Sequence, residues 1–201
     1  MGLAFVDDDH VVASSRTSGL LLFDLRDGRH RVLSSRPARA VAVDRRRGVI
    51  LAVLAEPAEL VRIGLDGQSA ASVFPCPGCR SVAVDPTGTI VATGSEEGIV
   101  RIGPASGGEP HLFFGRISPA GQRVAFSPDG RWVASSGEKP GVRLWPVPDI
   151  AQTPLHRRSH EEVLATLHSW TNLRAVKDPQ SATGWKLEPG VFPGWANLPH
   201  W

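Results

Sequence analysis

A pattern of about 40 residues recurs along roughly the first three quarters of the chain. Its clearest copies are Ser81–Pro104, SVAVDPTGTIVATGSEEGIVRIGP, and Arg123–Pro146, RVAFSPDGRWVASSGEKPGVRLWP, which align without a gap. Weaker copies occupy Leu3–Leu25 and Ala40–Leu65. The positions interpreted as equivalent in the third strand are Phe23, Gly64, Gly103 and Trp145. A period of this length, built of strand, turn, strand, turn and strand, is typical of propeller blades and not of helical solenoids.

Each clear copy carries a proline and a glycine two residues apart, between its first two strands. They are Pro86 and Gly88 in one copy and Pro128 and Gly130 in the other. Proline fixes φ, and glycine permits the positive φ that such a turn requires. The alternation in VAFS and WVASS fits strands packed on both faces between neighbouring blades. A fourth strand is expected at Arg29–Ser35, Ser69–Phe74 and Glu109–Gly115.

The repeats resemble those of WD40-repeat propellers, in particular the divergent bacterial kind, over about Leu3 to Asp149. The segment VAFSPDGRWVASSGEKPGVRLWPV carries the resemblance most strongly. The chain departs from the family pattern in three ways. No Gly-His pair precedes the first strand, Trp145 is followed by Pro146 instead of Asp, and Glu97 replaces the usual Asp before the third strand in one copy. The resemblance therefore implies a mainly β fold of propeller blades, but not the buried Asp–His network of better-conserved members.

Four blades are expected, at approximately 3–35, 39–75, 80–115 and 123–149, and the last has only three strands. WD40-type rings usually close with about seven blades, so these four make an incomplete ring. If each open end exposes ~500 Å² of apolar surface, at ~25 cal/mol/Å² the loss is roughly 12 kcal/mol per face as an upper bound. The sequence therefore predicts a C-terminal piece of a larger propeller, half of a ring completed by self-association, or an arc capped by other segments. The first of these is favoured.

Residues 150–201 follow a different pattern, and we expect them to pack on the blades. Ser159 and Glu162 form a capping box at the start of an expected helix, SHEEVLATLHSW, whose apolar positions share one face. The runs NLRAVKD and GWKLEPG predict a hairpin. Trp185 and Trp195 belong to an irregular Trp-rich tail. They are expected to anchor the tail because aromatic rings bury a large apolar area.

The run Leu167–Trp201 resembles the segment that follows the repeats in large bacterial proteins that combine a serine/threonine kinase domain with WD40 repeats. TNLRAV, ATGWKLEPG and FPGW carry this resemblance. It implies a fragment or a relative of the non-catalytic C-terminal propeller of a signalling kinase. The chain itself has no Gly-rich loop followed by a strand Lys, no His-Arg-Asp loop and no Asp-Phe-Gly. No kinase activity is therefore expected of it.

The sharpest local motif is CPGC, in which Cys76 and Cys79 lie between the second and third blades. A zinc site needs four ligands, and no second pair stands at a suitable spacing. A redox dithiol normally begins a helix, whereas this pair lies in a loop flanked by strands. The motif is interpreted as an inert loop, with a disulfide, a metal site or a redox role as the alternatives.

No other constellation of residues indicates catalysis. Asp7, Asp8, Asp9 and His10 align with the strand-connecting turn Pro128–Arg131, so they are expected to form a turn and not a metal site. The seven histidines do not recur at one repeat position, and no serine lies in a Gly-x-Ser-x-Gly elbow. The sequence therefore predicts no catalytic residue, no cofactor and no bound metal.

Charge and hydropathy exclude further classes of protein. Lys and Arg number 22 against 20 Asp and Glu, so no strongly basic face for nucleic acid is expected. The basic clusters Arg45–Arg47 and Arg157–Arg158 are interpreted as solvated turns. No run approaches the roughly 18 to 20 apolar residues of a membrane span, and the beginning MGLAFVDDDH does not fit a signal peptide. Two cysteines make no disulfide framework, which together with these absences favours the cytoplasm.

These observations predict a non-catalytic module or scaffold that binds other proteins. Rigid blades that display variable loops provide binding surfaces without any catalytic residue. Two other functions are considered. One is a divergent propeller enzyme with a site in its channel, because the fold alone does not exclude catalysis. The other is a truncated gene product without function.

Overall fold

The computed structural model describes residues 2–67, 70–108, 111–113, 123–137, 141–150, 153, 157–170, 173–181 and 183–189. These residues belong to two units, Met1–Ile150 and Ala151–Trp201. The first unit contains the repeats, and the second contains a helix and a hairpin. The expectation of a mainly β fold of antiparallel blades, followed by a short helix and a hairpin, is confirmed.

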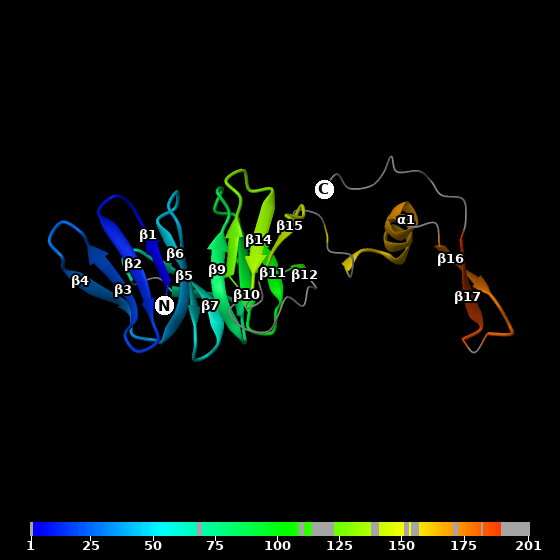
Figure 1. Ribbon diagram of the computed structural model, residues 1–201, viewed down its shortest axis with the longest axis horizontal. Coiled ribbons are helices and arrows are strands. Elements are labelled where there is room, and N and C mark those ends of the chain that lie inside the picture. Colours follow the sequence, from blue (N-terminus) through cyan, green and yellow to red (C-terminus); the bar gives the residue numbers. More distant parts are fainter. Residues whose placement is uncertain are drawn as a thin grey trace. The chain divides into compact units, whose positions relative to one another are not determined.

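Each repeat folds into one antiparallel sheet, and the sheets stand side by side in chain order (Figure 1). Blade 1 consists of β1 (Gly2–Phe5), β2 (His10–Ser15), β3 (Gly19–Asp24) and β4 (His30–Ser34). Blade 2 consists of β5 (Ala38–Asp44), β6 (Val49–Leu54), β7 (Glu59–Gly64) and β8 (Ala70–Pro75). Blade 3 consists of β9 (Cys79–Val84), β10 (Ile90–Ser95), β11 (Val100–Pro104) and β12 (His111–Phe113). Blade 4 has three strands among the described residues, namely β13 (Arg123–Phe126), β14 (Trp132–Ser136) and β15 (Val142–Pro146).

The first strands of neighbouring blades lie beside one another. β1 contacts β5, β5 contacts β9, and β9 contacts β13. Within each sheet the strands then follow in order away from this line of contacts. The first strands therefore form the inner edge of the stack, and the turns that connect them to the second strands meet at one end of it.

Each blade has two faces, and the pairing of its strands assigns side chains to them. Residues directly opposite in adjacent antiparallel strands share a face. In blade 2, Val43, Ile50 and Ile63 form one such row and pack against blade 1. Leu51 and Leu60 point the other way and pack against blade 3. We call the side that packs on the preceding blade the front face, and the side that packs on the following blade the rear face.

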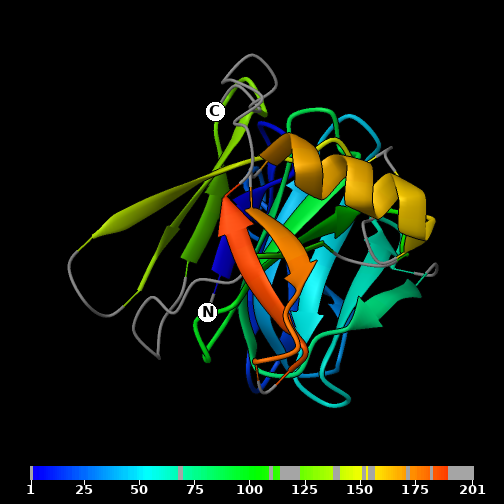
Figure 2. The ribbon, with the colours of Figure 1, turned by 90° about the vertical axis from the view of Figure 1, so that its right-hand side faces the viewer.

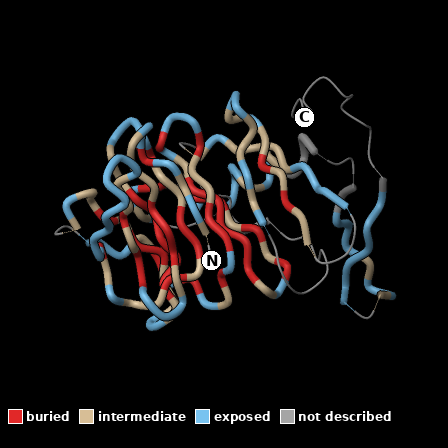
Figure 3. Tube along the Cα trace, turned by 60° about the vertical axis from the view of Figure 1, so that its left-hand side comes forward, coloured by how far each residue is buried: buried red, intermediate tan, exposed pale blue. Residues whose placement is uncertain are grey.

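In the part of the chain that the structure describes, the hydrophobic core consists of three clusters, one between each pair of successive blades. The cluster between blades 1 and 2 includes Val12, Leu20, Leu22, Val41, Ile50 and Ile63. The cluster between blades 2 and 3 includes Leu51, Val53, Leu60, Phe74, Val82 and Val91. The cluster between blades 3 and 4 includes Ala92, Val100, Ile102 and Val133. Burial follows the middle of the strands, whereas most of the turns are exposed (Figure 3). Near-continuous apolar runs such as VILAVL in β6 result from this burial of both faces.

One equivalence read from the sequence is wrong by one residue. The alignment of LVRIG with IVRIG places Gly64 opposite Gly103 of the next blade. In the structure, Val91 pairs with Gly103, and the corresponding residue Ile50 pairs with Ile63. The hairpin between β6 and β7 is one residue longer than its counterpart, so Ile63 occupies the position that the alignment gave to Gly64.

The second unit consists of α1 (His160–Trp170) and the antiparallel hairpin of β16 (Leu173–Lys177) and β17 (Trp185–Pro189), drawn in Figure 2. Trp185 lies on β17 with half of its surface exposed, and the Lys177 ammonium is 6.0 Å from the centre of its ring. Trp195 and the tail beyond Pro189 lie outside the described residues. Among the residues that are described, no helix is long and apolar enough to cross a membrane.

Candidate interaction surface

The turns between first and second strands are each fixed by an acidic side chain. In blade 2, the Asp44 carboxylate accepts hydrogen bonds from the backbone N–H groups of Arg46 and Arg47. The guanidinium of Arg47 donates to Asp44 at 2.9 Å and to the Thr87 carbonyl of blade 3 at 3.0 Å. The Asp44 side chain is buried. Its negative charge is paired with the guanidinium of Arg47, which also links blade 2 to blade 3.

Asp85 has the corresponding role in blade 3. Its carboxylate accepts hydrogen bonds from the backbone N–H groups of Thr87, Thr89 and Ile90 and from the Thr87 hydroxyl. Burial of Asp85 opposes its ionisation, but the hydrogen bonds from Thr87, Ile90 and Thr89 outweigh that effect and lower its pKa. The carboxylate of Asp85 is therefore ionised, and both of its oxygens accept hydrogen bonds from its own turn.

The blade 4 turn is held in a related way. Asp129 accepts hydrogen bonds from the Ser127 hydroxyl and from the backbone and guanidinium of Arg131, and these bonds lower its pKa, the Ser127 hydroxyl most strongly. Gly130 has φ +73°, as Gly88 does in blade 3. Pro128 precedes Gly130 and Pro86 precedes Gly88, so the proline and glycine expected in these turns lie there.

The acidic run of blade 1 also forms this turn. Asp7 accepts hydrogen bonds from the backbone N–H groups of Asp9 and His10, at 2.8 Å each. The Asp9 N–H, followed by the His10 ring, lowers the pKa of Asp7. Asp9 forms an ion pair with Arg26. Among the residues that the structure describes, no group of three or more acidic, His or Cys side chains could hold a metal.

A groove runs over the turns of blades 2, 3 and 4. Its volume is about 360 Å³, and it is lined by side chains that include Arg45, Arg46, Asp85, Pro86, Phe126 and Pro128. We call it the turn-end groove. Because the same turn from three successive blades builds it, the rigid packing of the blades holds its walls in place.

The charge of the turn-end groove is set by its arginines. Asp44 is paired with Arg47, and Asp85 is satisfied within its turn. Among the described residues, Arg45 donates only to the neutral carbonyl of Phe5, at 3.1 Å. The exposed guanidinium of Arg46 makes no hydrogen bond to any residue within the described ranges. The sequence interpretation of Arg45–Arg47 as a solvated turn missed this groove, although their place between first and second strands was the available signal.

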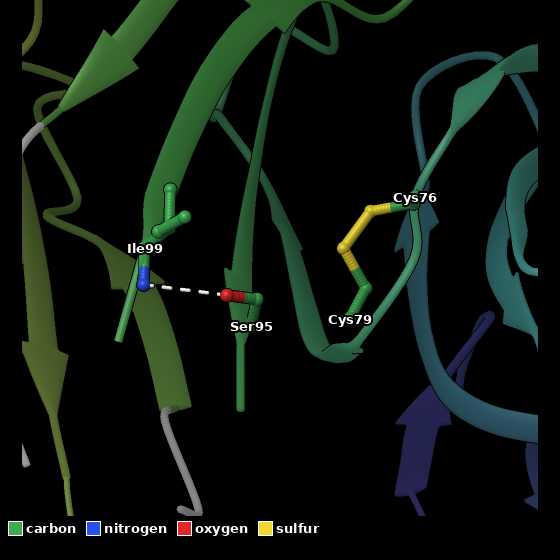
Figure 4. Close-up of a disulfide and its surroundings, with 4 residues drawn as sticks. All are labelled: Cys76, Cys79, Ser95 and Ile99. Atoms are coloured by element: carbon green, nitrogen blue, oxygen red, sulfur yellow. Dashed lines mark hydrogen bonds between the residues drawn. A yellow bond between two sulfur atoms is a disulfide. The ribbon is translucent and has the colours of Figure 1, made fainter. Parts of the chain in front are cut away.

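Cys76 and Cys79 are joined by a disulfide (Figure 4), which corrects the interpretation as an inert loop and the weaker one as metal ligands. Pro77 and Gly78, which has φ +71°, form a tight turn closed by a 3.2 Å hydrogen bond from the Cys79 N–H to the Cys76 carbonyl. This turn brings the two Cα atoms to 5.5 Å. Neither sulfur carries the thiolate that a metal requires. The bonded pair also removes the cysteine argument for a reducing compartment.

The surroundings of the disulfide are structural. Both cysteines are buried in the cluster between blades 2 and 3. The Cys76 N–H donates to the Ala58 carbonyl of blade 2, and the Gly78 carbonyl accepts from the Glu96 N–H of blade 3. The link therefore fastens the connection between two blades, and Figure 4 shows the nearby β10–β11 turn, where Ser95 accepts from the N–H of Ile99.

The remaining residues singled out in the sequence are not among those that line the groove. The indole N–H of Trp145 donates to the Ser135 hydroxyl at 2.8 Å, and its ring packs in the cluster between blades 3 and 4. Ser159 and Glu162 form the reciprocal capping bonds of α1, at 2.8 Å from the Ser159 N–H and 3.3 Å from the Glu162 N–H. The Ser159 N–H and hydroxyl lower the pKa of Glu162. These contacts stabilise the fold locally.

Comparison with known proteins agrees with this architecture. Residues 69–102 and 122–146 match the family described as "WD domain, G-beta repeat". No curated protein matches the chain. Many chains of solved structures do, among them one in the crystal structure of a nidogen/laminin complex, with a TM-score of 0.62, 13% identity and coverage of 68% of this chain and 56% of that one. This chain thus spans little more than half of that solved chain, and identity this low shows the fold alone. The first unit is a β-propeller-like stack of blades, and residues 69–102 and 122–146 within it match WD40 repeats.

Proposed function

We propose that the chain is a non-catalytic protein-interaction module that binds another protein in the turn-end groove. One observation carries this proposal: the turn between the first and second strands of blades 2, 3 and 4 builds the groove, one turn from each blade. WD40 domains are commonly protein-interaction modules, which supports the general class of function. Loops held on a rigid scaffold are suited to binding.

The chemistry of the groove favours a particular kind of partner segment. Arg46 offers a guanidinium that no described residue engages, and guanidinium groups bind carboxylates in a two-pronged geometry. Pro86, Phe126 and Pro128 supply apolar surface beside it. The proposed ligand is a protein segment that carries an acidic side chain next to an apolar one.

The absence of catalysis is part of the same proposal. Catalytic carboxylates need a position from which they can reach a substrate, with a pKa suited to proton transfer. The carboxylates of Asp44 and Asp85 instead accept hydrogen bonds inside their own turns. Their role is to shape the turns that display the arginines.

A peptide selection tests this function. Short peptides selected on the native chain from a random library are expected to be enriched in Asp and Glu. They should lose binding to an Arg46→Glu variant and keep it on Arg16→Glu, a matched control because Arg16 is also an exposed arginine, in the β2–β3 turn. Selected peptides without acidic enrichment, or equal binding to Arg46→Glu, would contradict the proposal.

The nature of the partner can be proposed more narrowly from the resemblance of Leu167–Trp201 to the segment that follows the repeats in bacterial WD40-repeat kinases. TNLRAV, ATGWKLEPG and FPGW support a role alongside a serine/threonine kinase. A kinase domain from the source cell is then expected to co-purify with the native chain and not with the Arg46→Glu variant. Recovery of no kinase with the native chain would count against this narrower proposal only.

A further inference from the structure

The front face of blade 1 is apolar, and no blade that the structure describes packs against it. Strand pairing places Leu3, Ala13, Leu21 and Val32 in one row of this face, and Phe5, Val11, Phe23 and His30 in the next. Leu3, Phe5 and Val32 are 66%, 54% and 57% exposed. No acidic, lysine or arginine side chain interrupts the two rows.

The same positions are covered in the other blades. The counterparts of Leu3 are Val41 in blade 2 and Val82 in blade 3, each only 8% exposed. In blade 2 this row packs on blade 1, and in blade 3 it packs on blade 2. The front face of blade 1 therefore has the chemistry of a blade interface.

The rear face of blade 4 shows the complementary situation. Val142 and Leu144 are 67% and 64% exposed. The counterparts of Val142 by strand pairing are Leu20, Leu60 and Val100, and none of them is more than 1% exposed. At this position of the rear face, an apolar side chain is thus buried in blades 1, 2 and 3 and exposed in blade 4.

The two open faces are of the two kinds that already pack together at three junctions within the chain. At each internal junction, the rear face of one blade packs on the front face of the next. The open faces are one rear face and one front face. A second copy of the chain presents the missing half of both junctions.

We propose that two copies of this chain associate head to tail, with the rear face of blade 4 in one copy packed on the front face of blade 1 in the other. Four blades from each copy make eight, which lies within the range of four to eight blades found in propellers. A head-to-tail contact that closes yields a ring with two identical junctions. The inference does not depend on the turn-end groove, which lies on blades 2 to 4.

Sedimentation velocity over a range of concentrations tests the proposal. The native chain is expected to shift from its monomer mass of 21.5 kDa to twice that mass. Phe5→Asp and Leu144→Asp should each hold the chain at monomer mass, because each removes one side of both junctions. Leu187→Asp, which alters an equally exposed leucine of the hairpin, should pair as the native chain does. Arg46→Glu should also pair normally, even if it abolishes peptide binding.

Mixing the two variants identifies the geometry. In a head-to-tail pair, Phe5→Asp and Leu144→Asp chains share one intact junction, so the mixture should regain a dimer that is weaker than the native one. If like faces met, one of the two variants would dimerise by itself. A native chain that stays monomeric, a mixture that does not pair, or loss of pairing in Leu187→Asp would overturn the proposal. If an aspartate variant fails to fold, Leu3→Ser and Val142→Ser repeat the same test with smaller changes.

Discussion

At the scale of single residues, the acidic side chains of this chain build turns. Asp44, Asp85 and Asp129 each occupy the same part of a blade, and each accepts hydrogen bonds from its own turn. A cluster such as Asp7-Asp8-Asp9 suggests metal binding when read alone, whereas its alignment with the other turns predicts the role that the structure shows. Position within the repeat is thus more informative than residue type.

Asp85→Ala should destabilise the protein by about 2 kcal/mol at neutral pH, because it removes an ionised acceptor of several buried hydrogen bonds. The lowered pKa of Asp85 means that its contribution is complete above about pH 4 and is lost as the pH falls through the folded-state pKa. Denaturant unfolding at several pH values measures this. The gap between native and variant chains should narrow in acid. Asp8→Ala, which alters an exposed acid of the blade 1 turn, should have little effect on stability at neutral pH, and an equal loss there would contradict the assignment.

Gly88→Ala and Gly130→Ala separate backbone strain from packing. Both glycines have φ +73°, so each substitution should cost about 1 to 2 kcal/mol in backbone strain. A Cβ at Gly88 would lie 2.1 Å from the carboxylate of Asp44, whereas at Gly130 the nearest atom, in Pro86, is 3.4 Å away. Gly88→Ala should therefore cost a further ~2 kcal/mol by displacing the Asp44–Arg47 pair. Thermal unfolding measures both losses. If Gly88→Ala and Gly130→Ala lowered stability equally, the Asp44–Arg47 pair could shift without cost, which would contradict this prediction.

At the scale of strands and blades, the repeat predicts the number and order of the sheets, because turn residues and alternating apolar residues recur along the sequence. It does not predict register. Gly64 matches Gly103 in sequence, but one extra residue in the β6–β7 hairpin puts Ile63 in that place. The sequence offers the disulfide only as an alternative, because the distance between Cys76 and Cys79 depends on the turn that Pro77 and Gly78 adopt.

The groove is harder to predict than the blades. Arg46 contributes to it because three turns from different repeats come together, and this convergence depends on how the blades stack. The sequence predicts each turn separately, but it does not predict that the three turns lie side by side. The blade count predicts an open face at each end of the stack, whereas the residues that form these faces follow only from the strand pairing.

A matched pair of valines tests the assignment of faces. Val100 and Val142 occupy equivalent positions on the rear faces of blades 3 and 4, with 1% and 67% of their surfaces exposed. Val100→Ala should lower the free energy of unfolding by about 2 kcal/mol, since it removes buried methyl groups. Val142→Ala should change it by less than about 0.5 kcal/mol in a dilute, monomeric sample. Similar losses at both positions would mean that the rear face of blade 4 is already covered within one chain.

At the scale of the whole molecule, the first unit is a stack of blades with two unlike ends. Among the described residues of the first unit, blades 2 and 3 are packed on both faces, whereas blades 1 and 4 are each packed on one. Stability should therefore be greatest in the middle of the stack and lowest at its ends, since repeat proteins gain stability from contacts between neighbours. The proposed pairing of two copies would remove this difference.

Backbone hydrogen exchange, followed at low and high protein concentration, tests this account most directly. In a dilute sample, β6 and β10 should exchange most slowly, and the strands of blades 1 and 4 should exchange faster. At high concentration, additional protection should arise in blades 1 and 4, with little change in blades 2 and 3. Uniformly slow exchange of all four blades in the dilute sample, or protection at high concentration that leaves blades 1 and 4 unchanged, would contradict an open stack of blades that a second copy completes.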